Sequence, residues 1–229
     1  MINLTVFTII YNDYGKFLDD WLKNLRKQTL KPKEIIVVLG KGHNVDITTY
    51  KGVKFIECDS DVMGVLRNEA IKAKRFKKVL YFSVDDELLP NAIQQIDLKF
   101  NQGFNLIGLR YLDRSIIATK EDINGNISYL HKDIKRESYI PTAKAIKNWR
   151  KSGVPGYIAV NGKYEYEPIE IPNYPYIFKL VREGLAVAHT DEVVAIYHRR
   201  KGSHGDTSVK QRRFKEFASI IDSYAKEEL

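Results

Sequence analysis

The sequence has few of the features that cross-link a small domain, anchor it in a membrane or join it to a second domain. Its single cysteine, Cys58, excludes an internal disulfide and fits a reducing compartment. The apolar run within residues 1–16 follows no basic leader and is too short to cross a bilayer, so we expect a first strand there rather than a signal peptide or an anchor. The chain has no internal repeat, low-complexity tract or Pro/Gly-rich linker, and its 229 residues suit one large domain without a sharp boundary.

Missing motifs exclude two classes of nucleotide-binding enzyme. No G-x-x-x-x-G-K-[ST] occurs, which excludes a P-loop nucleotidase. The stretch TIIYNDYGK, residues 8–16, contains no glycine-rich phosphate loop followed by an arginine. A sugar-nucleotidyltransferase would need such a loop near its first strand.

Positive charge is in excess. The chain has 37 Lys and Arg against 29 Asp and Glu, a formal net charge of +8. This excess indicates either a well-solvated surface or a partner rich in phosphate, such as nucleic acid, anionic lipid or a polyphosphate polymer. Net charge alone does not choose between these two interpretations.

Apolar strands alternate with amphipathic helices in the first half of the chain, which predicts an α/β fold with a mostly parallel sheet and helices on both faces. In such sheets ligands bind beyond the carboxyl ends of the strands. The second half is less regular. We expect strands over 4–10, 34–39, 53–58, 78–84, 105–112, 127–134, 156–171 and 192–198, and helices over 11–30, 63–76, 90–100, 142–153, 174–184 and from 209 onward.

Three adjacent acidic residues, Asp85, Asp86 and Glu87, follow the apolar run 79–84 directly. Like charges this close repel, so water, a basic neighbour or a metal ion must offset them. Carboxylates also follow two other expected strands, so we expect an anionic rim that faces a bound cation. The alternative is a solvated carboxylate cluster that complements the start of the next helix, a role that suits Glu87 best.

Four stretches carry a resemblance to a known family. They are TVFTIIYNDYGKFLDDWLKNLRKQTLKPKEIIVV (5–38), GVLRNEAIKA (64–73), YFSVDDELLP (81–90) and VREGLAVAHTDEVVAIYHRRKGS (181–203). In this order and spacing they resemble a GT-A fold glycosyltransferase of family 2, the group that uses nucleotide-sugar donors. The resemblance implies a Rossmann-like central sheet with a smaller mixed acceptor-side region. It divides the chain into a nucleotide-sugar-binding half (1–100), an acceptor-side half (101–205) and a C-terminal amphipathic helix (206–229).

The resemblance also implies a reaction, in which a sugar moves from a nucleotide diphosphate to an acceptor hydroxyl, assisted by Mn²⁺ or Mg²⁺. Asp85 aligns with the metal-binding aspartate of the family, and a UDP-hexose is the default donor. The implied donor-binding residues are Thr8, Tyr11, Asn12, Gly40, Arg67, Asp86, His198, Arg199 and Arg200.

The sequence departs from the family pattern at three places. Ser83 replaces the first aspartate of the metal motif, and Leu39-Gly40-Lys41-Gly42 replaces the segment whose aspartate reads the nucleobase. Asn173 stands where the family has its catalytic base, and an amide cannot accept a proton from the acceptor hydroxyl. Glu170 and Glu167 are the nearby candidates for that role. A degenerate, non-catalytic fold that binds an anionic partner is the alternative function.

The acceptor is the least defined partner. Basic stretches at 199–205 and 209–217 fall late in the chain, where such enzymes receive their acceptor. An anionic acceptor would follow: a teichoic-acid-like polymer, a lipid-linked saccharide or DNA. We expect the protein to lie in the cytoplasm or peripherally at the inner membrane face.

Overall fold

The computed structural model describes residues 1–121, 127–140, 156–169, 172–199, 218–220 and 222–223. Its strands form one nine-stranded sheet with the order β3-β2-β1-β4-β8-β6-β9-β5, and β7 pairs with β6 outside this path. The strands are β1 (Ile2–Ile10), β2 (Pro32–Leu39), β3 (Lys54–Glu57), β4 (Lys78–Tyr81), β5 (Glu87–Leu88), β6 (Leu106–Glu121), β7 (Ile127–Glu137), β8 (Ile158–Asn161) and β9 (Val187–Arg199).

The half of the sheet formed by the first strands is parallel. β1 lies between β2 and β4, and β3 pairs with the far edge of β2, all in the same direction. β8 runs antiparallel to both β4 and β6, whereas β9 is parallel to β6. The predicted α/β fold with a mostly parallel sheet is confirmed, and the mixed strands belong to the second half of the chain.

Helices cover both faces of this sheet, and the alternation of side chains along β1 separates two cores. On one face Leu4 and Val6 pack with α1 and α3, while on the other Phe7 and Ile9 pack with α2 and α4. Both groups are almost completely buried. The helices are α1 (Leu18–Arg26), α2 (Met63–Ala73), α3 (Ala92–Asn101) and α4 (Asn173–Arg182), with short 3₁₀ turns at Asn12–Phe17 and Ile47–Thr49.

Gln28, just after α1, fixes the segment that follows the acidic residues. Its side-chain amide donates to the carbonyl of Leu89 at 2.9 Å and accepts from the backbone N–H of Ile93 at 3.2 Å. The backbone N–H of Thr29 donates to the carbonyl of Pro90 at 2.8 Å. Because Ile93 lies in the first turn of α3, Gln28 also satisfies one of the amides that a helix start leaves without an intrahelical partner.

Several predicted boundaries differ from the structure. The strand predicted over 78–84 ends at Tyr81, because the chain turns at residues 83–86 before the two-residue β5. Of the strand predicted over 156–171, the structure has β8 at 158–161. The helix predicted over 142–153 lies outside the described residues, as does most of the C-terminal helix predicted over 206–229, of which 218–220 and 222–223 are helical.

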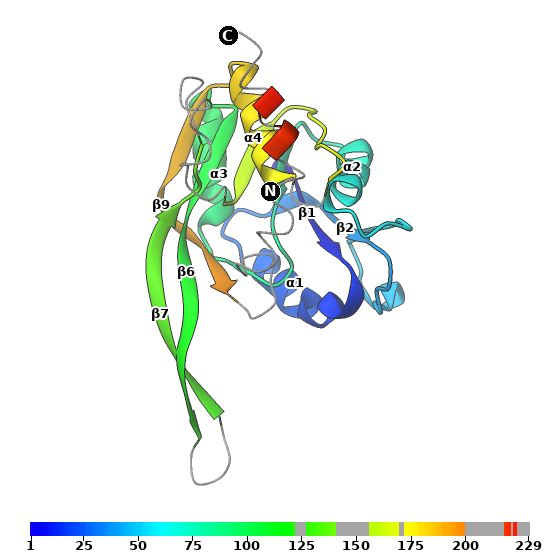
Figure 1. Ribbon diagram of the computed structural model, residues 1–229, viewed down its shortest axis with the longest axis vertical. Coiled ribbons are helices and arrows are strands. Elements are labelled where there is room, and N and C mark those ends of the chain that lie inside the picture. The colour runs from blue at the N-terminus through cyan, green and yellow to red at the C-terminus, as the bar shows by residue number, and fades with distance from the viewer. Residues whose placement is uncertain (122–126, 141–155, 170–171, 200–217, 221, 224–229) are drawn as a thin grey trace.

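β6 is much longer than the strand predicted over 105–112. Its second half pairs antiparallel with β7, from Arg110 opposite Glu137 to Glu121 opposite Ile127. Pairing with β9 ends at Ser115, so the rest of β6 has β7 as its described partner strand. Figure 1 shows the two strands as a ribbon that projects from the rest of the molecule.

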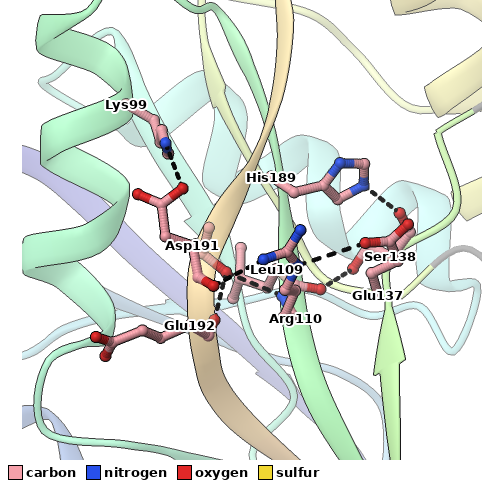
Figure 2. A network of polar contacts seen from close by, with 9 residues as sticks. Lys99, Leu109, Arg110, Glu137, Ser138, His189, Asp191 and Glu192 are labelled. Carbon is pink, nitrogen blue, oxygen red and sulfur yellow. Dashed lines mark hydrogen bonds and ion pairs between the residues drawn. The ribbon is translucent and has the colours of Figure 1, made fainter.

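β6 and β9 shift register on both sides of Arg110, and polar side chains close this irregularity. The Arg110 amide donates to the hydroxyl of Thr190 at 3.0 Å, and its guanidinium donates to the carbonyl of Asp191 at 2.7 Å. The Asp191 carboxylate pairs with Lys99 of α3 at 2.7 Å (Figure 2). The contacts link α3 to β9 and fix the direction in which β9 continues towards His198.

His189 belongs to the same network and has a structural role. Its Nε2 lies 2.8 Å from the carbonyl oxygen of Ser138 (Figure 2). The buried Ser138 hydroxyl in turn lies 2.6 Å from the carbonyl oxygen of Tyr157. These contacts join the end of β7 to β9 and to the segment that enters β8.

Candidate functional site

A hollow lies at the carboxyl ends of β1 and β4, where an α/β sheet offers its ligand site. Side chains from four parts of the fold line it: the end of β1 with the turn that follows, the start of α2, the end of β4 with the acidic turn, and β9. The lining residues are Ile9, Tyr11, Tyr14, Met63, Tyr81, Ser83, Val84, Asp85, Asp86 and Tyr197.

Two stacked tyrosines form one wall of the hollow. The rings of Tyr11 and Tyr14 lie 5.2 Å apart with an angle of 21° between their planes. The turn between them depends on Asn12, which adopts a left-handed conformation with φ of 50° that asparagine tolerates better than most residues. Asn12 itself is exposed, and its N–H bonds the carbonyl of Lys41 at 3.4 Å. The turn thus brings a flat aromatic surface to the edge of the hollow.

Asp85 and Asp86 differ sharply in their surroundings. Asp86 is 5% exposed, and its carboxylate accepts hydrogen bonds from the Tyr157 hydroxyl and, at 2.8 Å, from the backbone N–H of His198. Burial and the adjacent Asp86 carboxylate raise the pKa of Tyr157 well above its usual value, so Tyr157 stays protonated and donates. Asp86 therefore joins the acidic turn to β8 and β9, while Asp85 is half-buried in the wall of the hollow.

The structure brings Arg67 and Asn173 together. Arg67 is 3% exposed, and its guanidinium donates to the side-chain oxygen of Asn173. It also lies 3.7 Å above the ring of Tyr81 and 5.1 Å from that of Tyr166. Arg67 therefore holds the start of α4 against α2 and β4, below the hollow, and it does not line the hollow itself.

Two other predicted donor-binding residues are buried in the sheet. Thr8 is completely buried in β1, and its hydroxyl has no hydrogen-bond partner among the described residues. Gly40 follows β2, and its N–H bonds the carbonyl of Ile10 at 2.7 Å. A Cβ atom there would lie 2.9 Å from the carbonyl oxygen of Ser60 and from a methyl group of Leu66, so glycine permits this close packing. Neither Thr8 nor Gly40 lines the hollow.

The basic residues at the end of β9 have partners in the protein. Arg199 forms two hydrogen bonds with the buried carboxylate of Asp113, at 3.2 and 2.5 Å. The His198 ring lies 4.0 Å from the Glu87 carboxylate, and its backbone N–H is the group that bonds Asp86. Arg200 lies outside the described residues.

Glu167, one of the two glutamates proposed as bases, lies in a segment that packs on α2. Asn68 and Tyr166 exchange hydrogen bonds of 2.9 and 2.7 Å, and the Gly64 N–H bonds the carbonyl of Ile169 at 3.0 Å. A Cβ atom at Gly64 would lie 1.8 Å from the carbonyl oxygen of Glu167, so this glycine lets the segment approach. Glu167 is half-buried there, and Glu170 lies outside the described residues.

Carboxylates at the hollow are too few for a metal site made of protein ligands alone. Among the described residues no group of three or more His, Cys, Asp or Glu side chains could hold a metal ion. Mg²⁺ and similar ions, however, are often held by one or two carboxylates together with the phosphates of a substrate and water. Asp85, at the wall of the hollow, fits that kind of site.

Sequence analysis missed six residues that line the hollow: Ile9, Tyr14, Met63, Tyr81, Val84 and Tyr197. Tyr14 had a detectable signal, because it stands three residues after Tyr11 and a single turn can place the two rings on one side. Tyr197 comes from a distant strand, and the pairing of β9 with β6 and with β5 brings it to the hollow.

Comparison with known proteins finds similarity in structure. No protein-family model and no curated protein sequence matches the chain. Among solved structures, Staphylococcus aureus TarS 1-349 in complex with UDP-GlcNAc has a TM-score of 0.68 at 14% identity, and the match covers 100% of this chain and 68% of that one. In a longer TarS structure the match has a TM-score of 0.66 at 14% identity and spans 39% of that chain.

A mannosyltransferase from Pyrobaculum calidifontis, PcManGT, is similar too. Its complex with GDP-Man and Mn²⁺ has a TM-score of 0.59 at 10% identity, with 97% of this chain and 69% of that one covered. TM-scores of this size show that these proteins share the fold of this chain. The chain therefore has the GT-A glycosyltransferase fold, as the sequence resemblance implied.

Proposed function

We propose that the protein is a family 2 glycosyltransferase that moves a hexose from a nucleotide-diphosphate sugar to an acceptor hydroxyl. The observation that carries this proposal is the hollow at the carboxyl ends of β1 and β4, which is lined by the stacked rings of Tyr11 and Tyr14 and by Asp85. Solved structures of the same fold hold UDP-GlcNAc, or GDP-Man with Mn²⁺. An aromatic wall and a carboxylate in one hollow suit a ligand with a flat base at one end and phosphates further along.

The donor nucleobase stacks on Tyr11 or Tyr14 in this proposal, since any base has a π-face that an aromatic ring can contact. The diphosphate then lies beside Ser83 and Asp85. A stacked base is recognised by shape more than by hydrogen bonds, and Gly40 supplies no side chain to read it. UDP-hexose is the default donor, and a GDP-sugar is the next to test.

Asp85 is the residue that would hold Mn²⁺ or Mg²⁺, together with the donor phosphates. Such an ion stabilises the negative charge that develops on the departing diphosphate. Asp86 acts on Asp85 as a positioning residue, because its buried bonds to Tyr157 and His198 fix the turn that carries both carboxylates.

Asn173 is not the proton acceptor in this proposal. Its side-chain oxygen is bonded to a buried guanidinium, and an amide does not titrate in the working pH range. A glutamate of the adjacent segment, Glu167 or Glu170, takes the proton from the acceptor hydroxyl. The packing of that segment on α2, whose first residue Met63 lines the hollow, supports this assignment.

The chain is divided by task in this proposal. Residues 1–100 bind the donor, residues 101–205 receive the acceptor, and the C-terminal helix over 206–229 docks on the core. The acceptor is phosphate-rich, because the formal net charge is +8 and the basic stretches at 199–205 and 209–217 fall late in the sequence. A teichoic-acid-like polymer, a lipid-linked saccharide and DNA remain the candidates.

Release of nucleotide diphosphate from a panel of UDP-, GDP-, CDP- and dTDP-sugars, with Mn²⁺ present, tests the proposal. We expect turnover with at least one donor, and a loss of about 100-fold or more in Asp85→Asn, because the developing charge loses a principal stabilising group. Asp20→Asn, which changes an exposed carboxylate on α1, is the matched control and should keep full activity. Nucleotide binding without turnover of any donor would contradict the proposal and favour the non-catalytic binding module.

A further inference from the structure

The part of the β6–β7 hairpin made of residues 116–121 and 127–135 is here called the arm. Residues 132–135 of β7 form its base, opposite 112–115 of β6, and the rest of the arm extends past Ser115, the last residue of β6 that pairs with β9. Six further residues of β6 give it a length of roughly 20 Å at the usual rise of a strand. An isolated two-stranded ribbon buries little surface and is marginally stable in water. Figure 1 shows no other element lying along the arm.

Exposed apolar side chains are concentrated on the arm. Of the seven large hydrophobic residues exposed in the described part of the chain, four belong to it: Ile116 (52%), Tyr129 (53%), Leu130 (60%) and Ile134 (37%). Single exposed apolar residues are ordinary, whereas a group of them on one projecting element marks an interaction surface.

The apolar residues lie on both faces of the ribbon. Ile116 pairs with His131, which shares a face of β7 with Tyr129, whereas Leu130 and Ile134 alternate onto the other face. A partner protein with a flat surface would cover one face of the arm and leave the other in water. A surrounding medium such as the lipid interface contacts both faces at once.

Lysines accompany these apolar groups and have no ion-pair partner in the described part of the chain. Lys132 and Lys135 are exposed on β7, whereas the acidic Asp133 between them is already bound to Arg114 by two hydrogen bonds of 2.9 and 2.7 Å. The remaining positive charge is complementary to anionic headgroups, and long lysine side chains reach such groups while their methylenes stay on apolar surface.

The edges of the arm are protected against pairing with a second copy of the chain. Lysines on an edge strand and a register irregularity both discourage edge-to-edge pairing. β7 carries Lys132 and Lys135, and the register of β6 against β7 shifts between Ile116 and Ala118 of β6. The open backbone groups of both edges still need water, which limits insertion to the hydrated headgroup region.

We propose that the arm docks the protein on anionic membranes, with Ile116, Tyr129 and Leu130 in the headgroup region and Lys132 and Lys135 against lipid phosphates. Docking of this kind does not depend on the proposed glycosyl transfer, because it uses exposed side chains of the hairpin that do not line the hollow, and it needs no donor. It would bring the body of the enzyme to a lipid-borne or surface-bound acceptor.

Flotation of the full chain with vesicles, in the absence of any nucleotide sugar, tests this inference. We expect binding to vesicles of phosphatidylcholine and phosphatidylglycerol at 3:1, little binding to phosphatidylcholine alone, and a steep decrease when salt is raised from about 50 to 500 mM. Leu130→Ser should weaken the partition by about tenfold through lost apolar contact. Each lysine near an anionic surface contributes roughly fivefold or more to membrane binding. The double variant Lys132→Glu, Lys135→Glu should therefore weaken the partition by more than tenfold.

Two control variants carry the same chemical changes elsewhere. Leu98→Ser alters an exposed leucine of α3, and Lys51→Glu alters an exposed lysine after the second 3₁₀ turn. Both should float like the unchanged protein. Equal loss in the arm and control variants, or no binding of the unchanged protein to anionic vesicles, would overturn the inference. So would a dimer in solution that Leu130→Ser converts to a monomer while vesicles are not bound, because the arm would then serve a second copy.

Discussion

At the scale of single residues, the adjacent carboxylates Asp85 and Asp86 divide two tasks. The two carboxylate oxygens of Asp86 accept hydrogen bonds from the Tyr157 hydroxyl and from the His198 backbone N–H, and these bonds fix the acidic turn. Asp85, one residue earlier, lines the hollow. The sequence shows two equivalent acids, because only the packing of β8 and β9 distinguishes them.

Removal of the Tyr157 hydroxyl tests the positioning role of Asp86. In Tyr157→Phe the buried carboxylate loses one charge-assisted hydrogen bond, so we expect the free energy of unfolding to fall by about 2 kcal/mol. Tyr111→Phe removes the same atom from a buried tyrosine whose hydroxyl bonds no carboxylate among the described residues, and it should cost less. Urea unfolding of the two variants measures the difference, and equal losses would contradict the assignment.

Asn173 provides a second test at this scale. Asn173→Ala leaves a buried guanidinium without its amide acceptor, so we expect a loss of about 1–3 kcal/mol in unfolding free energy. The pH at which activity falls on the acid side should not move, because the amide does not titrate. A shifted acid limb in the pH–rate profile would show that Asn173 acts on the proton acceptor directly, contrary to the proposal.

At the scale of elements, buried polar side chains hold the strands and helices in the arrangement that forms the hollow. Glu34 of β2 accepts hydrogen bonds from Thr5 of β1 at 2.5 Å and from the backbone and side chain of Arg75, which follows α2, at 2.8 and 3.0 Å. Burial alone would raise the pKa of Glu34, but these hydrogen bonds and the Arg75 charge outweigh it and hold the pKa below its usual value.

This pKa shift has a consequence for stability. Because the folded state lowers the pKa of Glu34, its contribution is fully present above the unfolded value of about 4.5 and is lost as pH falls through the folded value. Glu34→Gln should therefore be less stable than the unchanged protein at pH 7, and the gap should narrow below about pH 4.5. Urea unfolding across pH 7 to 3.5 measures it, and a gap that stays constant would contradict this account.

The sequence predicted the elements that follow from the local periodicity of apolar residues. It did not predict the elements that exist through pairing with a distant strand. The parallel strands and the helices α1, α2 and α3 follow from local alternation of apolar residues. The length of β6 does not, because Asp113 to Glu121 is too polar to read as a strand and forms one through its pairing with β7. Likewise β5 is two residues long and exists through its pairing with β9.

The candidate site was predictable to the same degree. The sequence located Tyr11 and Asp85, which follow strands of the parallel half, whereas Arg67 had no sequence signal that it is buried beneath the hollow. Its burial results from Tyr166 and Asn173, about 100 positions away, which only the fold brings together. The positions of residues whose contacts come from the second half of the chain were therefore the hardest to predict from the sequence.

At the scale of the whole molecule, the net charge of +8 and the late basic stretches point to an anionic acceptor. Each phosphate contact releases counterions, so the apparent acceptor affinity should fall steeply between roughly 50 and 200 mM salt. Donor affinity should change far less, because the donor lies in the hollow. Initial rates at a fixed donor concentration and varied acceptor concentration measure the apparent acceptor affinity at each salt concentration. An acceptor affinity that does not change with salt would indicate a neutral saccharide instead.

In the described part of the chain no helix is long and apolar enough to span a membrane. The proposed donor site lies in the hollow at the ends of β1 and β4, and the arm of β6 and β7 projects away from the body. If both proposals hold, donor binding and membrane docking use separate elements, so a variant can lose one and keep the other.

The most direct test of the central proposal is calorimetric titration of UDP and GDP into the protein, with Mn²⁺ and then with EDTA. If Asp85 and the donor phosphates share an ion, we expect one nucleotide to bind at least tenfold more tightly with Mn²⁺, and that gain to vanish in Asp85→Asn while Asp20→Asn retains it. Equal affinity with Mn²⁺ and EDTA, or a gain that survives Asp85→Asn, would contradict the account.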